Sequence, residues 1–358
     1  MAASDPPPPP REGKPPLPWR MRLLVAAIST LHAACLRRDG TVNRLLLSVF
    51  DRLVPATPRP VDGGVASSDH AVSDRLRVRL FVPDDADDGG TRQRRQLPVV
   101  VYFHGAGFVF HSAATAQYDA LCRRLASAVP AVVASVDYRL APEHRFPAPY
   151  DDGEAALRWA LAGAGGALPS PPAAVFVAGD SAGGNIAHHV AARMPAAVAG
   201  LVALQPFFGG EAPTASELRL RDAPFGAPGR LAWLWRAFLP AGATRDHEAA
   251  NVPAAVLRDA GAGAGPWRAF PPALVCVGGW DAHQDRQRAY AEALRAAGAG
   301  DVHVAEYPDA IHGFYMFEEL ADSERLMADV AEFVNRRAED LMKKRSVAHA
   351  RELHRLPC

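Results

Sequence analysis

The sequence predicts an α/β protein with a mostly parallel central sheet that is flanked by helices. Short apolar runs of strand length alternate with longer segments whose apolar residues recur at helical spacing. Such alternation is typical of parallel strands joined by crossover helices on both faces of one sheet. The segment between residues 204 and 273 is too long for a connecting loop, and it predicts a cap inserted into the sheet.

The strand and helix patterns follow one another in a regular order. Buried strands are expected over 97–103, 131–136, 174–178, 200–204 and 273–277, with an alternating strand over 302–307. The alternation over 75–82 predicts an early antiparallel strand with one exposed face. Helices are expected over about 115–128, 151–163, 184–194, 285–297 and 322–341, and a solvated loop over 83–96.

The N-terminal part of the chain predicts a lid. Residues 1–18 are rich in proline, which favours a disordered or polyproline tail. The apolar stretch Met21–Cys35 is too short to span a bilayer. Its apolar residues recur at helical spacing, at Leu23, Leu24, Ile28, Leu31 and Ala34. We expect an amphipathic helix here, with a targeting segment as the alternative. A second helix is expected over Leu45–Leu53, and the two together suggest a lid over a pocket.

These patterns divide the chain into four parts. They are a proline-rich tail (1–18), a helical lid (19–60), an α/β domain (61–342, with the cap at about 206–255) and a flexible C-terminal tail (343–358). The cap segment is rich in aromatic side chains, which either line a pocket or only pack the cap: Phe207, Phe208, Trp233, Trp235 and Phe238.

Composition excludes several classes of partner. The 358 residues are 49% apolar, and 39 Lys and Arg balance 39 Asp and Glu. A net charge of zero argues against nucleic acid and against an anionic membrane surface. The four cysteines show no paired spacing and fit a reducing compartment; they are Cys35, Cys122, Cys276 and Cys358.

The segment Gly179–Asn185 (Gly-Asp-Ser-Ala-Gly-Gly-Asn) carries the strongest chemical signal. It lies between an apolar run and a helical pattern, and it matches the G-x-S-x-G nucleophile elbow. A Cβ at Gly179 or Gly183 would collide with neighbouring backbone in so sharp a turn. Ser181 is therefore the candidate nucleophile, exposed at the end of a strand and close to a helix N-terminus.

A serine nucleophile needs a base, and the base needs a carboxylate to orient it. In α/β-hydrolases these groups follow the serine in the order Asp or Glu, then His. Asp281 comes first after the strand predicted over 273–277 and is the expected carboxylate, whereas Asp285 is better placed to cap the next helix. Read with His283, the two aspartates could also form a metal cluster, but the spacing is weak and we expect no metal or cofactor.

The expected base is His312, which follows the last predicted strand in a turn before the terminal helix. His303 lies within a strand pattern and is expected at the surface or in a cross-strand contact. His188 and His189 lie on the helix after the elbow, and one of them is expected to face the core.

The segment His104-Gly105-Ala106-Gly107 follows the first buried strand and matches an HGGG-type oxyanion loop. The N–H groups of Ala106 and Gly107, with that of Ala182 beside the serine, are the expected oxyanion donors. His104 and Gly105 are expected to organise the loop. Because alanine replaces the middle glycine, we expect its methyl group to narrow the hole and to exclude a positive φ.

Together, these motifs resemble the plant carboxylesterases of the hormone-sensitive-lipase-like group, the "GDXG" lipolytic family, which also includes the gibberellin receptors. The resemblance is carried by His104–Gly107, Asp137–Glu143, Phe146–Ala148, Gly179–Asn185, Asp281 and Asp309–Phe314. It implies the α/β-hydrolase fold, and the segment Arg38–Arg44 is similar to the lid of the plant members. The gibberellin receptors have lost the catalytic histidine, whereas this chain has His312.

We therefore expect a serine carboxylesterase that hydrolyses small to medium esters, in an apolar pocket beneath the lid and cap. A gibberellin-receptor-like binding protein and a 2-hydroxyisoflavanone dehydratase-like enzyme are the alternatives that the resemblance leaves open. We expect a monomer or weak dimer in the cytoplasm, with the nucleus left open as a second compartment. A membrane-anchored protein is a further alternative, which depends on residues 21–36.

Overall fold

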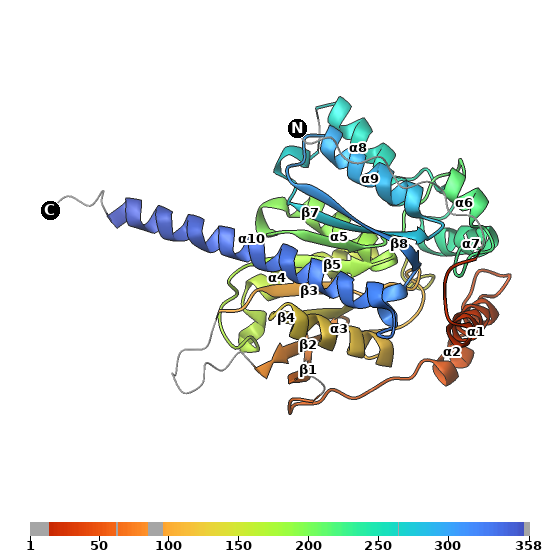
Figure 1. Ribbon diagram of the computed structural model, residues 1–358, viewed down its shortest axis with the longest axis horizontal. Helices are drawn as coiled ribbons and strands as arrows, with labels where there is room; N and C mark the ends of the chain where they lie inside the picture. The colour runs from red at the N-terminus through yellow and green to blue at the C-terminus, as the bar shows by residue number, and fades with distance from the viewer. Residues whose placement is uncertain (1–13, 62–63, 85–95, 264, 354–358) are drawn as a thin grey trace.

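An eight-stranded sheet forms the centre of the described molecule (Figure 1). The computed structural model describes residues 14–61, 64–84, 96–263 and 265–353, with side chains described to residue 346. The strands are β1 Val65–Ala71, β2 Arg77–Pro83, β3 Val99–Phe103, β4 Val132–Asp137, β5 Val175–Asp180, β6 Leu201–Leu204, β7 Ala273–Trp280 and β8 Val302–Ile311. Their order is β1-β2-β4-β3-β5-β6-β7-β8. β2 is antiparallel to β1 and β4, and the other neighbours are parallel.

Helices cover both faces of the sheet. Side chains of β3 alternate between two apolar clusters, because successive residues of a strand point to opposite faces. Val101 and Phe103 pack on the side of α4 (Ala148–Leu161), α5 (Ala182–Arg193) and α9 (Gln284–Ala296). Val100 and Tyr102 pack on the side of α3 (Ala116–Ala128) and α10 (Ala321–Leu353). Short 3₁₀ helices cover Ala164–Gly166, Pro195–Ala197, Trp267–Ala269 and Phe314–Met316.

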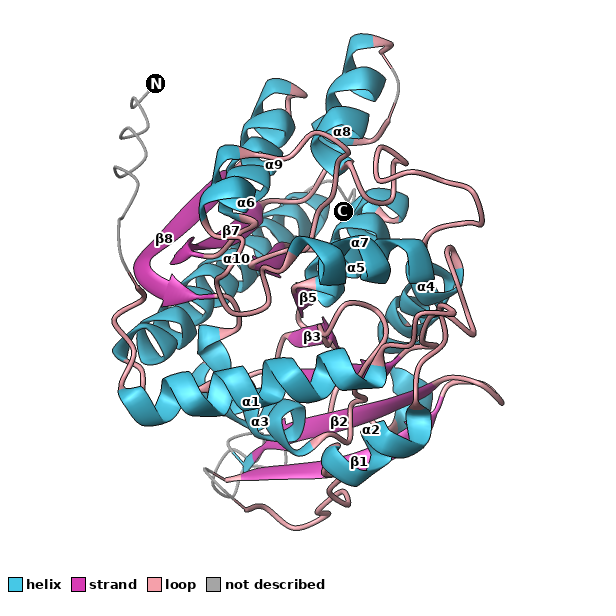
Figure 2. Ribbon diagram, turned by 90° about the vertical axis from the view of Figure 1, so that its right-hand side faces the viewer, coloured by secondary structure: helices cyan, strands magenta, loops and turns pink. Residues whose placement is uncertain are grey.

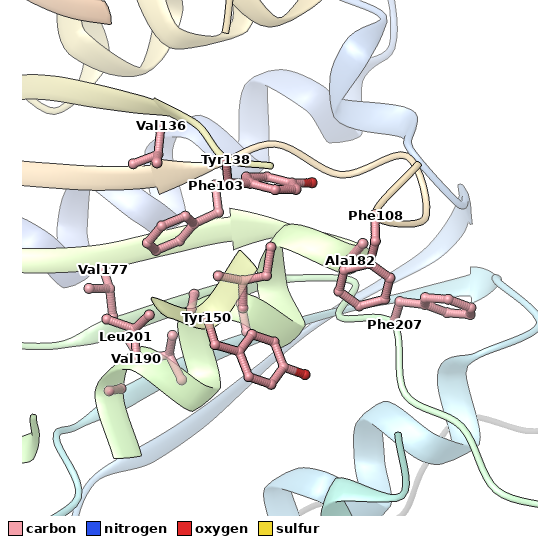
Figure 3. Close-up of a cluster of buried hydrophobic side chains, with 14 of the residues drawn as sticks. Phe103, Phe108, Val136, Tyr138, Tyr150, Val177, Ala182, Val190, Leu201 and Phe207 are labelled. Atoms are coloured by element: carbon pink, nitrogen blue, oxygen red, sulfur yellow. The ribbon is translucent and has the colours of Figure 1, made fainter. Parts of the chain in front are cut away.

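The helix after the elbow packs directly on the strands that lead to it. Val177 and Leu201 are register partners in β5 and β6, and they lie beside Val190 of α5 (Figure 3). This core continues toward the cap, where the rings of Phe108 and Phe207 lie 6.2 Å apart. Ala182, the first residue of α5, lies in the same cluster, so this packing also holds the start of the helix next to the candidate nucleophile.

The lid and the first two cap helices gather at one side of the sheet, whereas the last cap helix lies beside α9 (Figures 1 and 2). The lid helices are α1 (Trp19–Cys35) and α2 (Arg44–Phe50), and the segment between β6 and β7 forms α6 (Ala215–Arg219), α7 (Pro228–Phe238) and α8 (Val252–Gly261). Trp233 of α7 donates its indole N–H to the carbonyl of Arg37 at 2.9 Å. Arg44 pairs with Glu143 at 2.6 Å, so the lid is joined to the cap and to the body.

The strands and helices expected from the sequence are confirmed, with two exceptions at the early strands. Strand β1 was not predicted, because Val-Ala-Ser-Ser-Asp-His-Ala lacks an apolar run. The exposed face predicted for residues 75–82 is confirmed at Arg75 and Arg77 but is wrong at Arg79 of β2, which is only 3% exposed. Its guanidinium pairs with Asp69 at 2.7 Å and Asp119 at 3.0 Å, which allows a charged residue on a covered face.

The predicted apolar face of the first helix is also wrong in part. Met21 and Val25 are buried, whereas Leu23 is 62% exposed. Spacing identified a helix here, but the stripe that packs on the body is displaced from Leu23. In the proline-rich tail, Leu17 is buried at 6% exposure, and residues 1–13 lie outside the described residues. Most of the predicted loop, 85–95, also lies outside them.

The flexible C-terminal tail predicted over 343–358 is wrong as far as Leu353, because helix α10 continues to that residue, and residues 354–358 lie outside the described residues. No glycine or proline interrupts Ala321–Leu353, and the segment is rich in helix-forming residues, so nothing local ends the helix at 342. Among the described residues, no helix combines the length and the apolar character needed to cross a membrane.

Asn185 of α5 generates a prediction about stability. Its side chain accepts from the Tyr150 hydroxyl at 2.5 Å and donates to the carbonyls of Ala249 at 2.8 Å and Phe207 at 3.2 Å. Asn185→Ala leaves these buried groups unsatisfied, so we expect it to lower the free energy of unfolding by about 3 kcal/mol in urea denaturation. The matched control Asn251→Ala removes a bond to Asp246 on an exposed loop, and we expect a loss below about 1 kcal/mol. Equal losses in the two variants would contradict this account.

Candidate active site

Ser181 lies at the sharp turn between β5 and α5. Its backbone has φ +50° and ψ −116°, a strained conformation for a residue with a side chain. A Cβ on Gly179 would lie 2.3 Å from the carbonyl oxygen of Gly183, and one on Gly183 would lie 1.9 Å from that of Phe103. Both glycines are therefore required by close approach of backbone, as the sequence predicted.

The structure brings Ser181, His312 and Asp281 together. Each of the three directly follows a strand: β5, β8 and β7, respectively. His312 Nε2 lies 3.0 Å from Ser181 Oγ, and His312 Nδ1 lies 2.8 Å from Asp281 Oδ2. An ionised carboxylate only accepts hydrogen bonds, so Nδ1 carries the proton and Nε2 can accept from the serine hydroxyl.

Asp281 is a fully buried carboxylate that is well supplied with donors. The His283 backbone N–H donates to Oδ1 at 2.9 Å, and the Gln287 amide donates to Oδ2 at 2.8 Å. Burial acts to raise the pKa of Asp281, but the charge and hydrogen bond of His312 outweigh it and hold the pKa at about 2. The carboxylate is therefore ionised at neutral pH and fixed in orientation.

The pKa of His312 responds in the opposite direction. Burial acts to lower it, but the charge and hydrogen bond of Asp281 outweigh the burial and raise the pKa above its ordinary value of about 6.5. A raised pKa makes the imidazole a stronger base toward Ser181. The triplet can therefore move a proton from the hydroxyl to the ring and stabilise the imidazolium that results.

The other titratable candidates lie elsewhere. Asp285 lies in the first turn of α9, but it accepts a hydrogen bond from the Ser216 backbone N–H of α6 at 2.7 Å. It therefore binds the cap segment, and the prediction that it caps the N-terminus of its own helix is wrong.

His303 pairs with Asp301 at the surface. His188 is buried and bonds to the Tyr290 hydroxyl at 2.8 Å. Within the described residues, no group of three His, Cys, Asp or Glu side chains could hold a metal ion.

The expected oxyanion loop lies beside the serine. Ala106 and Gly107 line the same cavity as Ser181. Ala182 is the first residue of α5, so its N–H has no partner within the helix. The expectation that Ala106 excludes a positive φ is wrong, since Ala106 has φ +70° and Gly107 has φ +67°. The surrounding packing holds alanine in the left-handed region, at a cost of about 1 kcal/mol.

His104 and Gly105 are placed to hold this loop. His104 is fully buried and stacks on Tyr138, with ring centroids 4.3 Å apart. The Tyr138 hydroxyl donates to the carbonyl of His104 at 2.7 Å, and the Gly105 N–H donates to the Tyr118 hydroxyl at 3.0 Å. Burial lowers the pKa of His104 to about 3, so its ring stays neutral near pH 7.

Asp180, directly before the nucleophile, was not singled out from the sequence. Its buried carboxylate accepts from Tyr102 at 2.7 Å, Tyr118 at 3.1 Å and Tyr315 at 3.2 Å. The three hydroxyls come from β3, α3 and the 3₁₀ helix after His312. Asp180 therefore joins the nucleophile turn to the oxyanion loop and to the histidine loop. The position inside Gly-Asp-Ser was the available signal, but the tyrosines are far apart in sequence.

A cavity of about 620 Å³ opens over Ser181 and His312. The lid contributes Leu24, Ile28 and His32 to its wall. One of the five cap aromatics, Phe207, lines the cavity. Phe208, Trp235 and Phe238 pack in the hydrophobic core, and Trp233 forms a hydrogen bond to the lid. The aromatic wall is completed by Phe110, Phe225 and Phe317, which lack a distinctive sequence pattern.

Three polar side chains of the cavity were also not predicted as site residues. His283 is 3% exposed, and its ring lies 5.4 Å from that of His312, centroid to centroid. His32 stacks on Phe110 at 4.6 Å. Arg230 of α7 lines the same wall. His283 follows Asp281 by two positions, whereas His32 and Arg230 are brought to the serine by the folded lid and cap, so spacing along the chain gave no signal for those two.

Comparison with known proteins identifies the family. A family model described as the α/β hydrolase fold matches residues 100–316, and one described as the carboxylesterase family matches residues 51–143. The gibberellin receptor GID1 of Oryza sativa subsp. japonica is 37% identical over 89% of this chain and 94% of its own length. The gibberellin receptor GID1C of Arabidopsis thaliana is 39% identical, over 90% and 96%. Carboxylesterase 20 of the same plant is 38% identical, over 60% and 68%.

Solved structures of esterases share the fold. An ester-hydrolase from the metagenome of Lake Arreo, EH1AB1, is 27% identical with a TM-score of 0.70, and the match covers 89% of this chain and 98% of that one. The hyperthermophilic esterase of the archaeon Pyrobaculum calidifontis is 27% identical with a TM-score of 0.67, over 91% and 99%. The fold and the resemblance inferred from the motifs are thereby confirmed. The chain belongs to the hormone-sensitive-lipase-like family of α/β hydrolases, together with plant carboxylesterases and gibberellin receptors.

Proposed function

We propose that the protein is a serine carboxylesterase that hydrolyses carboxylic esters through an acyl-enzyme. The observation that carries this proposal is the continuous chain of hydrogen bonds from Ser181 Oγ through His312 to Asp281. A chain of this kind activates a hydroxyl, which by itself is a weak nucleophile at neutral pH. A protein that only bound a ligand would have no need of all three groups in this geometry.

The acylation step follows from the positions of the three side chains. Ser181 Oγ attacks the ester carbonyl while its proton passes to His312 Nε2, and Asp281 stabilises the imidazolium. The N–H groups of Ala106, Gly107 and Ala182 stabilise the tetrahedral oxyanion, and each such donor contributes about a hundred- to a thousandfold to the rate. His312 then gives its proton to the leaving alcohol, and the acyl group stays on Ser181.

Deacylation repeats the cycle with water. The water molecule loses a proton to His312 Nε2 as it attacks the acyl-enzyme, and the second tetrahedral intermediate collapses to the carboxylic acid. The proton on His312 returns to Ser181 Oγ. The volume of about 620 Å³ is typical of pockets for small molecules, and it suits esters of small to medium size.

A gibberellin-receptor-like binding function is the second candidate. The named receptors match almost the whole chain, and the lid residues Leu24, Ile28 and His32 line the cavity. A receptor of this kind would hold a small molecule beneath the lid without turning it over. The resemblance implies that the receptors lack the histidine that His312 supplies here, which favours hydrolysis.

Replacement of the nucleophile tests the proposed activity. Ser181→Ala removes the attacking oxygen, so we expect kcat for 4-nitrophenyl butyrate to fall by about 10⁴-fold or more. The matched control Ser48→Ala lies on the exposed side of α2, and we expect it to change kcat by less than about twofold. Steady-state assays of the purified full chain measure both.

The same proteins separate the two candidate functions. If the protein is an esterase, we expect the wild type to turn over aryl esters. We also expect the Ser181→Ala variant to show no binding of gibberellin by calorimetry. Wild-type activity in that variant would remove Ser181 from the mechanism. Tight gibberellin binding without ester turnover would establish the receptor function instead.

The pH dependence of kcat/KM tests the pairing of His312 with Asp281. His312 must be neutral to accept a proton, so activity is lost as the pH falls through its pKa. Because Asp281 raises that pKa, we expect the acid limb of the profile to have its midpoint above about 6.5. By linkage, this pair stabilises the fold most below about pH 6.5 and loses that contribution as the pH rises through the raised pKa.

Asp281→Asn is the companion variant for this prediction. It removes the charge that raises the pKa of His312, so the acid limb is expected to move to lower pH while kcat falls by about 10⁴-fold. An acid limb that is unchanged in this variant would show that a different group controls the profile.

A further inference from the structure

Arg230 is a charged residue of the cavity that the proposed reaction does not use. It lies in the first turn of α7 and lines the same cavity as Ser181 and His312. Its Nη2 donates to the carbonyl of Ser29 in α1, and its Cζ lies 5.8 Å from the centroid of the Phe225 ring. The guanidinium is therefore held where the lid meets the cap.

No carboxylate of the described residues lies within 4.0 Å of the Arg230 guanidinium. Other arginines with covered side chains do have such partners: Arg79 pairs with Asp69 and Asp119, Arg123 with Asp119, and Arg286 with Glu217. These three side chains are 3%, 6% and 9% exposed, respectively. The most deeply buried arginines thus have carboxylate partners, whereas Arg230 has none among the residues that the structure describes.

This arrangement is costly unless a ligand completes it. Burial lowers the pKa of Arg230 from its ordinary value, yet a guanidinium keeps its proton in proteins. Withdrawing such a charge from water is unfavourable without an opposite charge. The guanidinium has five N–H donors, and the bond to Ser29 commits one of them. Donors of a half-buried cation are thus available beside the cavity.

The other charged groups of the cavity do not neutralise Arg230. Glu318 lies 3.7 Å from Arg124, and the Asp180 carboxylate is held by three tyrosines. Glu319 also lines the cavity, but it is exposed. Burial is the main cause that lowers the pKa of His32 to about 3, and the nearby His111 and Arg230 also contribute. His32 is therefore neutral near pH 7 and brings no negative charge to this wall.

We propose that Arg230 binds a carboxylate at the non-reacting end of the substrate, so that the preferred substrates are esters whose acyl chain ends in a carboxylate. This inference rests on the proposed esterase function. A planar carboxylate matches the two parallel N–H groups of a guanidinium. Ile28, Leu231 and Leu234 line the same cavity and suit the apolar chain that joins the two ends of such a substrate.

The contact between lid and cap strengthens this recognition. A carboxylate at Arg230 would lie beside α1 and the Phe225 ring, and these two neighbours would limit the access of water to it. Charge-assisted hydrogen bonds gain strength as water is excluded from around them. Neutral esters of the same length would leave the guanidinium without a partner, which is how a buried polar group discriminates between substrates.

Matched substrates test the proposal. The mono-4-nitrophenyl esters of adipic, suberic and sebacic acids carry a distal carboxylate, and their methyl-capped counterparts are neutral at the same length. In the wild-type protein we expect kcat/KM to favour the carboxylate member of at least one pair by about tenfold or more. Arg230→Met is expected to abolish this preference, and Arg230→Lys to keep part of it.

The matched control is Arg236→Met, on the exposed face of the same helix, which is expected to leave the preference as in the wild type. Circular dichroism confirms that each variant is folded. If the wild type hydrolyses the capped esters but shows no preference in any pair, the inference about Arg230 is wrong and the esterase function stands. A preference that survives in Arg230→Met also overturns it.

A binding measurement keeps the inference testable even if no ester is hydrolysed. Calorimetry on the Ser181→Ala protein compares 6-phenylhexanoate with 6-phenylhexanamide, which differ only in the charged end. We expect the carboxylate to bind at least about tenfold more tightly, and the difference to disappear when Arg230→Met is added. Equal affinities for the acid and the amide would overturn the proposal independently of catalysis.

Discussion

The site depends on a close approach between two stretches of backbone. The start of α5 lies so near the end of β3 that a Cβ on Gly183 would lie 1.9 Å from the carbonyl oxygen of Phe103. This contact sets the nucleophile turn beside the loop that begins at His104. Because it joins backbone to backbone, no change of side-chain rotamer could relieve a larger residue at 183.

The strained backbone conformation of Ser181 is stabilised by hydrogen bonds of its own N–H and carbonyl groups. Its N–H donates to the carbonyl of Leu204 at 2.9 Å, and its carbonyl accepts from the Phe207 N–H at 2.8 Å. Gln205, buried at the end of β6, donates to the carbonyl of Ile311 at 3.2 Å and accepts from the Gly313 N–H at 2.8 Å. The residues on either side of His312 are thus tied to the strand next to the nucleophile. Preorganisation of this kind fixes the distance between base and hydroxyl.

The features that could be predicted from the sequence are those that depend on residues close together in the chain. Ser181 was singled out because flanking glycines mark the elbow, and Asp281 and His312 because they are the first carboxylate and the first histidine after the strands predicted over 273–277 and 302–307. The fold class followed from the alternation of apolar runs with helical patterns. These features depend on residues that are neighbours in the chain.

Features that depend on tertiary contacts could not be predicted. The polar strand β1 forms because β2 pairs with it, and Arg79 is buried because Asp69 and Asp119 neutralise it. The positive φ of Ala106 reflects the packing around its loop. Arg230 lies some 50 positions from Ser181 in the chain, and only the folded cap brings it to the cavity. Neither its distance along the chain nor its neighbours in sequence indicate that role.

Either candidate function would use the same cavity, so the property that distinguishes them is whether Ser181 reacts with the ligand. The central claim is that Ser181 becomes acylated during turnover. Rapid quenching of the protein with a short-chain aryl ester, followed by mass spectrometry of the intact chain and its peptides, measures this directly. The account predicts one acyl group per chain, on the peptide that contains Ser181. An unmodified Ser181 in every quenched sample, or an acyl group on another residue, would contradict it.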